Sequence, residues 1–152
     1  MKKRKKEKIY QLKHKKKIST KHTNDINDLL VALSDRRIKI KRERLEELKK
    51  SLSLEVHLLE IEGKVIGMGS LHYLESLVQK GAHIDDVVVH PGHRGKGYGT
   101  KIMNHLIKRA REQRLHFLEL TSRPSRVAAN KLYQKLKFEP RDTNVYRLKL
   151  KK

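Results

Sequence analysis

The spacing of apolar side chains divides the chain into short alternating runs and longer helical ones. Two alternating runs meet at Glu62-Gly63-Lys64, and a glycine between two such runs is typical of a β-hairpin turn. A further run, AHIDDVVV, ends where Pro91-Gly92 interrupts the pattern. Six segments are expected to be strands: residues 18–21, 54–61, 64–74, 82–89, 116–120 and 144–150.

Apolar residues at intervals of three and four indicate helices. Ile26, Leu29 and Leu33 show this spacing after Asn24 or Asp25, either of which can cap a helix. The order β-α-α-β-β-β-α-β-α-β then indicates a mixed sheet with helices on its faces, in the α/β (α+β) class. The helices are expected near residues 24–33, 39–51, 97–110 and 124–136.

Composition changes this picture mainly at the ends of the chain. The 152 residues are about one domain's worth, and part of the net charge of +21 lies in the opening MKKRKKEKIYQLKHKKK. Residues 1–16 are therefore expected to be a flexible basic tail, and residues 17–152 a single domain. The tail is either a solvated segment or an arm that contacts nucleic acid weakly.

Several classes of function are excluded by what the sequence lacks. It has no cysteine, which excludes disulfides, thiolate zinc sites and a cysteine nucleophile. No run approaches the roughly 20 apolar residues of a membrane span, and the basic start lacks the apolar stretch of a secretory signal. A cytoplasmic location, or a nuclear one in a eukaryote, is therefore expected, with no membrane contact and an affinity for polyanions.

The stretch HRGKGYG, residues 93–99, follows a strand and precedes a helix, which is the layout of a phosphate site. A Walker loop would need Ser or Thr after Lys96, and a dinucleotide fingerprint would need different glycine spacing and an earlier place in the chain. Instead, Arg94-x-x-Gly97-x-Gly99 resembles the acyl-CoA pyrophosphate loop of the GNAT superfamily of N-acetyltransferases. A second block, residues 125–138, resembles that family's "AA-x-x-LY-x-K-LGF" helix.

This resemblance covers about residues 17–150 and implies a GNAT-like fold. Such a fold has a mixed, mostly antiparallel central sheet of six to seven strands, flanked by about four helices. Two residues depart from the family's pattern. Lys137 stands where glycine is usual, and Arg126 where many members have an asparagine that contacts the cofactor. Asn130 is the nearby amide that could substitute.

The resemblance also implies an acetyl-CoA site and a tyrosine general acid. A phenol that is still protonated at neutral pH can protonate the leaving thiolate, and Tyr133 stands at the family's position for this role. The alternative for Tyr133 is a packing role. A backbone N–H at Val89 would polarise the thioester carbonyl. The residues expected to contact acetyl-CoA are Val87, Val88, Val89, Arg94, Gly95, Lys96, Gly97, Tyr98, Gly99, Thr100 and Asn130.

A base must also remove a proton from the acceptor ammonium. In a regular strand, His83 and Asp85 share the face of Val89, whereas Asp86 faces the other side unless a bulge changes the alternation. Asp85 is therefore the first choice for the base and His83 the second; alternatively, these side chains are only solvated. No metal is expected, because the pair His90 and His93 has no matching second pair.

The acceptor is expected to be a primary amine of a small molecule or a protein. By the resemblance, it would lie between residues 24–52 and the loop 139–145. HIDDVVV is similar to a motif of amino-sugar-phosphate acetyltransferases, but an amino acid, a polyamine or a protein amine stays open. A homodimer also stays open. The alternative function is a module that binds RNA or DNA on an inactive acetyltransferase fold.

Overall fold

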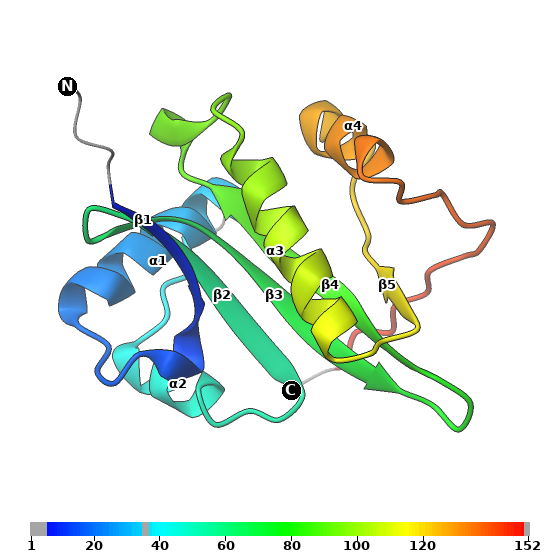
Figure 1. Ribbon diagram of the computed structural model, residues 1–152, viewed down its shortest axis with the longest axis horizontal. Helices are drawn as coiled ribbons and strands as arrows, with labels where there is room; N and C mark the ends of the chain where they lie inside the picture. The colour runs from blue at the N-terminus through cyan, green and yellow to red at the C-terminus, as the bar shows by residue number, and fades with distance from the viewer. Residues whose placement is uncertain (1–5, 35–36, 151–152) are drawn as a thin grey trace. The chain divides into compact units, whose positions relative to one another are not determined.

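The computed structural model describes residues 6–34 and 37–150. By internal contacts, the chain divides into unit 1, Met1–Thr121, and unit 2, Ser122–Lys152. Their elements are drawn in Figure 1. In chain order they are β1 (Glu7–Gln11), the 3-10 helix η1 (Leu12–His14), α1 (Thr20–Ser34), α2 (Arg42–Leu48), β2 (Leu54–Ile61), β3 (Lys64–Glu75), β4 (Lys80–Val89), η2 (Pro91–His93), α3 (Tyr98–Glu112), β5 (Phe117–Glu119) and, in unit 2, α4 (Val127–Lys135).

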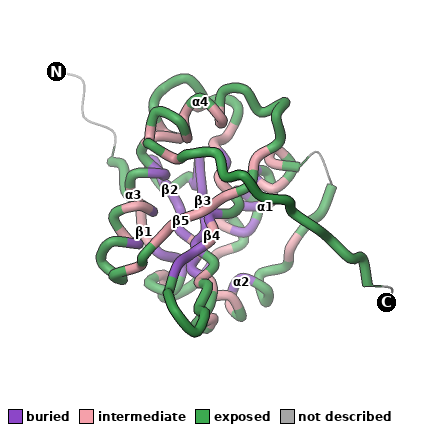
Figure 2. Tube along the Cα trace, turned by 90° about the vertical axis from the view of Figure 1, so that its right-hand side faces the viewer, coloured by how far each residue is buried: buried purple, intermediate pink, exposed green. Residues whose placement is uncertain are grey.

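One sheet, with the strand order β1-β2-β3-β4-β5, organises unit 1. All its pairs are antiparallel except β4 with β5, which is parallel. The predicted hairpin is confirmed, with β2 and β3 separated by a two-residue turn at Glu62 and Gly63. The buried residues are concentrated on β2, β3 and β4, as Figure 2 shows.

Helices cover both faces of this sheet. Met68 and Val88 pack with Ile26 and Leu29 of α1 in a buried cluster on one face. On the other face, a side chain at Gly67 would meet Ile102 of α3, so that helix lies very close to β3. The alternation of side chains along β3 therefore separates the α1 side of the sheet from the α3 side.

The expected count of six to seven strands was wrong, because the described residues form five. Residues 18–21 lead into α1 instead, which begins at Thr20. The predicted strand over 144–150 is irregular backbone, and its apolar side chains, such as Leu148, are exposed. An alternating pattern becomes a strand only when a neighbour satisfies its backbone hydrogen bonds, and no strand pairs with this segment within the described ranges.

The expectation of a flexible tail over residues 1–16 was wrong for residues 7–14. Glu7 to Gln11 pair with β2 as strand β1, and Leu12 is buried in the core with 2% of its surface exposed. Residues 1–5 lie outside the described ranges. The many lysines around IYQL gave this segment the composition of a charged tail, although it has enough apolar side chains to join the sheet.

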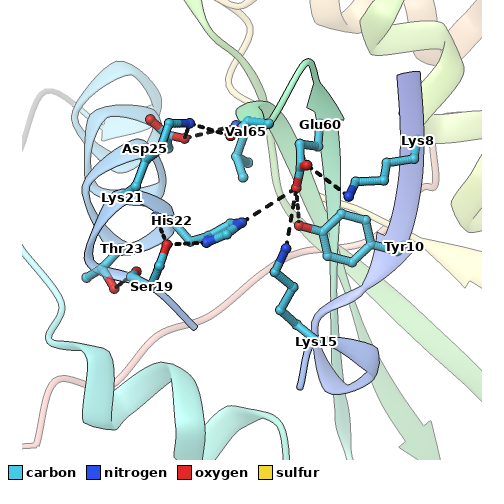
Figure 3. Close-up of polar contacts among 11 residues, drawn as sticks. Lys8, Tyr10, Lys15, Ser19, Lys21, His22, Thr23, Asp25, Glu60 and Val65 are labelled. Atoms are coloured by element: carbon cyan, nitrogen blue, oxygen red, sulfur yellow. Dashed lines mark hydrogen bonds and ion pairs between the residues drawn. The ribbon is translucent and has the colours of Figure 1, made fainter. Parts of the chain in front are cut away.

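A buried carboxylate holds this N-terminal segment in place (Figure 3). Glu60 accepts a hydrogen bond from the Tyr10 hydroxyl at 2.6 Å, and its oxygens lie 2.9 Å from Lys8 Nζ and 3.8 Å from Lys15 Nζ. His22 Nε2 of α1 is 3.6 Å away. Burial raises the pKa of Glu60, but Tyr10, Lys8 and Lys15 outweigh that effect and lower it to about 2.

Glu60→Gln is expected to lower the free energy of unfolding by about 2 kcal/mol at pH 7, because lysines and a tyrosine lose a charged acceptor. The pKa of Glu60 in the folded protein lies below its ordinary value of 4.5. The stabilisation is therefore complete above about pH 4.5 and is lost as the pH falls toward 2.

Urea denaturation from pH 7 to pH 2.5 tests this expectation. The difference between Glu60→Gln and the unsubstituted protein should shrink as the solution becomes acidic. Glu47→Gln is the matched control, because Glu47 pairs with Arg44 on the surface and should matter little. A Glu60→Gln protein as stable as the parent at pH 7 would refute the anchoring role.

Candidate functional site

A β-bulge interrupts β4 in the middle of the motif HIDDVVV. Met68 lies opposite Val88 and Ser70 lies opposite Asp85, so β4 has one more residue than β3 between these pairs. Asp86 has a left-handed backbone with φ 55°. The extra residue reverses the alternation of side chains along the second half of β4.

Because of this bulge, His83 and Asp85 do not share the face of Val89. Asp85 lies opposite Ser70, which has the same orientation on β3 as Met68, so His83 and Asp85 point to the α1 side. Val89 lies opposite Gly67 and points to the α3 side. The expected common face was therefore wrong, and the regular alternation assumed for β4 is the reason.

The bulge brings a second carboxylate to the α1 side. Asp86 Oδ2 accepts a hydrogen bond from Ser70 Oγ at 3.1 Å. Burial raises the pKa of Asp86, the Ser70 hydrogen bond opposes that rise, and the charge of Asp85 adds to it. Asp86 therefore joins Asp85 as a candidate proton acceptor on the α1 side, although the bulge does not bring it to the face of Val89.

His83 lies between two carboxylates from neighbouring strands. Its Nε2 is 3.6 Å from Asp85 Oδ1, and its Nδ1 is 3.9 Å from Glu119 Oε1 on β5. No local sequence pattern singles out Glu119, since only the parallel pairing of β4 with β5 brings it opposite His83. A carboxylate therefore lies on each side of this imidazole, at ion-pair distance.

The pairing of β4 with β5 ends early and leaves part of β4 without a neighbour on that side. The last pair is His83 with Glu119, whereas β4 continues to Val89. The N–H of His90 donates to Ile66 O of β3 at 2.8 Å, so the N–H of the preceding Val89 points to the opposite side. The Val89 N–H is therefore a backbone donor on the β5 side of β4, at a position beyond the end of the β4–β5 pairing.

The glycine-rich stretch after β4 forms a turn that leads into α3, as predicted. Gly95 and Gly97 have φ values of 73° and 81°, a left-handed conformation that glycine adopts most easily. A side chain at either position would meet no atom within 4 Å. Among the described residues, no acceptor binds the backbone N–H groups of residues 95–100. They form a site suited to an anion at the positive end of a helix dipole.

Two basic side chains stiffen this turn from outside. Arg94 Nε donates to Val89 O at 3.1 Å, and Lys96 Nζ donates to Gly92 O at 3.4 Å. Each retains further N–H groups for an anion. Tyr98 is directed elsewhere, because its hydroxyl donates to Glu7 of β1 at 3.4 Å.

Unit 2 contains the other two predicted site residues. Within this unit, the Tyr133 ring lies 6.3 Å from the Phe138 ring, between centroids. Burial raises the pKa of Tyr133, with Arg126 opposing, so the phenol remains protonated at neutral pH.

The side-chain amide of Asn130 donates to Arg123 O at 2.9 Å, which orders the segment before α4. Lys137, which stands where glycine is usual in the family, has a left-handed backbone with φ 69°, a conformation that glycine adopts most easily.

A further polar network joins α3 to β2. Arg109 donates to both oxygens of Glu55, at 2.9 and 2.7 Å. His57 lies 3.0 Å from Glu55 and 2.9 Å from His105 of α3. Burial raises the pKa of Glu55, but Arg109 and His57 outweigh it and lower the pKa well below its usual range. Sequence reasoning missed this network, whose members lie up to 54 positions apart.

Residues 6–34 and 37–150 contain neither a metal-binding cluster nor a membrane-spanning helix. No group of three histidine or acidic side chains there could hold a metal ion, despite the many such residues between His83 and His93. No helix in those ranges is long and apolar enough to cross a bilayer.

Comparison with known proteins gives a family model and many similar structures. Residues 24–138 match the model of the acetyltransferase (GNAT) family. Among curated protein sequences, none is similar enough to this chain to count as a match.

Three of the similar solved structures illustrate the fold. An acetyltransferase from Trypanosoma brucei is 20% identical, with a TM-score of 0.76 over 95% of this chain and 100% of the other. A ribosomal-protein-alanine N-acetyltransferase from Brucella melitensis biovar Abortus 2308 is 18% identical, with a TM-score of 0.73 over 95% and 99%. A glucosamine-6-phosphate N-acetyltransferase from Arabidopsis thaliana is 21% identical, with a TM-score of 0.74 over 94% and 98%. These likenesses confirm the expected mixed α/β fold.

Proposed function

This chain belongs to the acetyltransferase (GNAT) family, and from that premise we propose that it transfers an acetyl group from acetyl-CoA to a primary amine. The observation that carries the proposal is the turn over residues 94–100, with its open backbone N–H groups and two glycines that leave space for a ligand. These N–H groups bind the pyrophosphate of acetyl-CoA, and Arg94 and Lys96 add positive charge.

The acetyl group would lie beside the unpaired part of β4. Support comes from the Val89 N–H, which points to the side where β5 has ended. There it donates to the thioester oxygen as that oxygen gains negative charge. Tyr133 supplies the proton that the departing thiolate needs, and its raised pKa keeps that proton in place at neutral pH.

The acceptor amine loses its proton to the acidic cluster on β4. Asp85 takes this role with His83, which carries the proton toward Glu119, and Asp86 is the competing acceptor. The amine then attacks the thioester directly. A C–N bond forms and a C–S bond breaks, and CoA leaves as a thiol with the proton from Tyr133. The acylated nitrogen loses its second proton, which restores the Tyr133 hydroxyl through solvent.

Asp85→Asn is expected to lower kcat/KM about tenfold or more, with an unchanged affinity for acetyl-CoA, since it removes only a proton acceptor. Asp86→Asn is the comparison that identifies the base. Glu75→Gln, on the exposed end of β3, is the control and should change nothing. If Asp86→Asn alone lowers kcat/KM, then Asp86, rather than Asp85, is the base.

Titration calorimetry with acetyl-CoA at moderate salt tests the proposed function as a whole. ATP is the necessary control, because a protein of net charge +21 attracts any polyphosphate. Saturable binding of acetyl-CoA, with ATP much weaker, supports the proposal and justifies a screen of amines by release of the CoA thiol. Binding that matches ATP and disappears with salt favours the alternative of a polyanion-binding module on an inactive fold.

A further inference from the structure

Lysines from two segments of unit 1 form one surface, which we call the lysine surface: Lys13, Lys16, Lys17, Lys49 and Lys50. All of them except the half-buried Lys49 are exposed. We propose that this surface binds the phosphate backbone of a double-stranded nucleic acid. This inference is independent of the proposed acetyl transfer. It also differs from the flexible nucleic-acid-binding arm considered for residues 1–16, because the five lysines lie in the part of the chain that the structure describes.

The two segments are held against each other by specific contacts. Lys49 Nζ donates to the backbone oxygen of Lys16 at 3.3 Å, and the N–H of Ile18 donates to Glu46 of α2 at 3.4 Å. Lys13 and Ser51 line the same cavity of about 390 Å³. The end of α2 therefore lies beside residues 13–18 and continues the row of positive charge.

Most of this charge is not neutralised by the protein. In the part of the chain that the structure describes, Lys13, Lys16, Lys17 and Lys50 have no carboxylate within 4 Å, and Lys49 pairs with Glu46. The neighbouring Lys8 and Lys15 are instead directed to Glu60. The N-terminal segment is thus anchored by two lysines while others face solvent, so ligand binding need not order a flexible arm.

The chemistry of the lysine surface favours a phosphate backbone over bases or lipid. Tyr10, the nearest tyrosine in sequence, has its hydroxyl bound to Glu60 and the ammonium groups of Lys8 and Lys15 at 5.3 and 5.4 Å from its ring centroid, so its face is not open to stacking bases. The exposed His14 offers only a small imidazole ring. Leu52 is the exposed aliphatic side chain next to Lys50. One leucine buries too little apolar surface to anchor the protein in a bilayer. Lysines that contact phosphates give binding without sequence preference and with strong salt dependence.

Fluorescence anisotropy with a labelled DNA duplex, and with an RNA duplex of the same sequence, tests the proposal across a salt series. The test variant is Lys13→Gln/Lys16→Gln/Lys17→Gln. Deleting residues 1–16 is unsuitable, because it would remove β1 and the buried Leu12. Removing three lysines that contact phosphates should reduce the slope of log K against log salt by about 2 to 3 and weaken binding about tenfold near 0.1 M salt.

The matched control removes the same charge from other exposed positions: Lys64→Gln/Lys108→Gln/Arg111→Gln. It should leave the slope nearly unchanged, and both variants should keep the affinity for acetyl-CoA. Equal losses of duplex affinity in the two variants, or none in either, would overturn the proposal. So would capture by phosphatidylserine-containing vesicles that depends on the three lysines while the duplexes bind unchanged.

Discussion

Gly97→Val is expected to weaken acetyl-CoA binding by about 10- to 100-fold. Gly97 has φ 81° at the point where the turn becomes α3. A β-branched residue in this conformation costs about 1–3 kcal/mol, and each 1.4 kcal/mol is a factor of ten in affinity. Relieving the strain would rotate the backbone N–H groups that are proposed to hold the pyrophosphate, so the loss should appear in binding itself.

Calorimetry with acetyl-CoA measures this loss, and Gly63→Val provides a matched control. Gly63 has φ 80° in the β2–β3 turn, also with no atom within 4 Å of an added side chain. The two variants introduce the same strain at different places. Gly63→Val should lose stability but retain acetyl-CoA affinity. Normal binding by Gly97→Val would refute the assignment of the turn.

Tyr133→Phe is expected to lower turnover at least about tenfold with little change in acetyl-CoA affinity. The substitution removes only the hydroxyl, which is proposed to protonate the thiolate after the C–S bond begins to break. The ring and its contact with Phe138 remain, so the fold of unit 2 should not change.

Release of the CoA thiol under saturating acetyl-CoA and acceptor measures the effect. Tyr146→Phe is the control, because that exposed tyrosine of the same unit also loses a hydroxyl. Unchanged turnover in Tyr133→Phe would leave this residue with the packing role that the sequence also allowed. A loss of turnover in both variants would mean that removing either hydroxyl disturbs unit 2 in general, which would contradict a specific role for the Tyr133 phenol.

The parts of the fold that the sequence predicted correctly depend on local signals. The hairpin at Gly63, the break at Pro91 and the glycine turn before α3 each follow from backbone preferences of one or two residues. The bulge at Asp86 could not be predicted in this way. It depends on the register against β3, where Gly69 leaves room for the α3 side chains above it.

Strand β1 was missed for a different reason. Its pairing partner begins about 50 residues later, and its anchor, Glu60, is just as far from Tyr10 in sequence. Lysine content dominates the local composition, so the apolar residues of IYQL carry little weight until β2 is placed beside them. The expectation that His83 and Asp85 share the face of Val89 failed similarly, since a single inserted residue reverses the alternation of side chains beyond it.

The position of β1 at the end of the strand order also bears on how the protein remains dispersed in solution. An edge strand leaves one row of backbone N–H and C=O groups free to recruit another chain. Here the exposed Lys6 and Lys8 lie along that edge. Because Lys8 shares the single carboxylate of Glu60 with Lys15, a second copy pairing along the edge would still bring excess positive charge together. The lysines that made strand β1 hard to recognise in the sequence thus protect it against edge-to-edge aggregation.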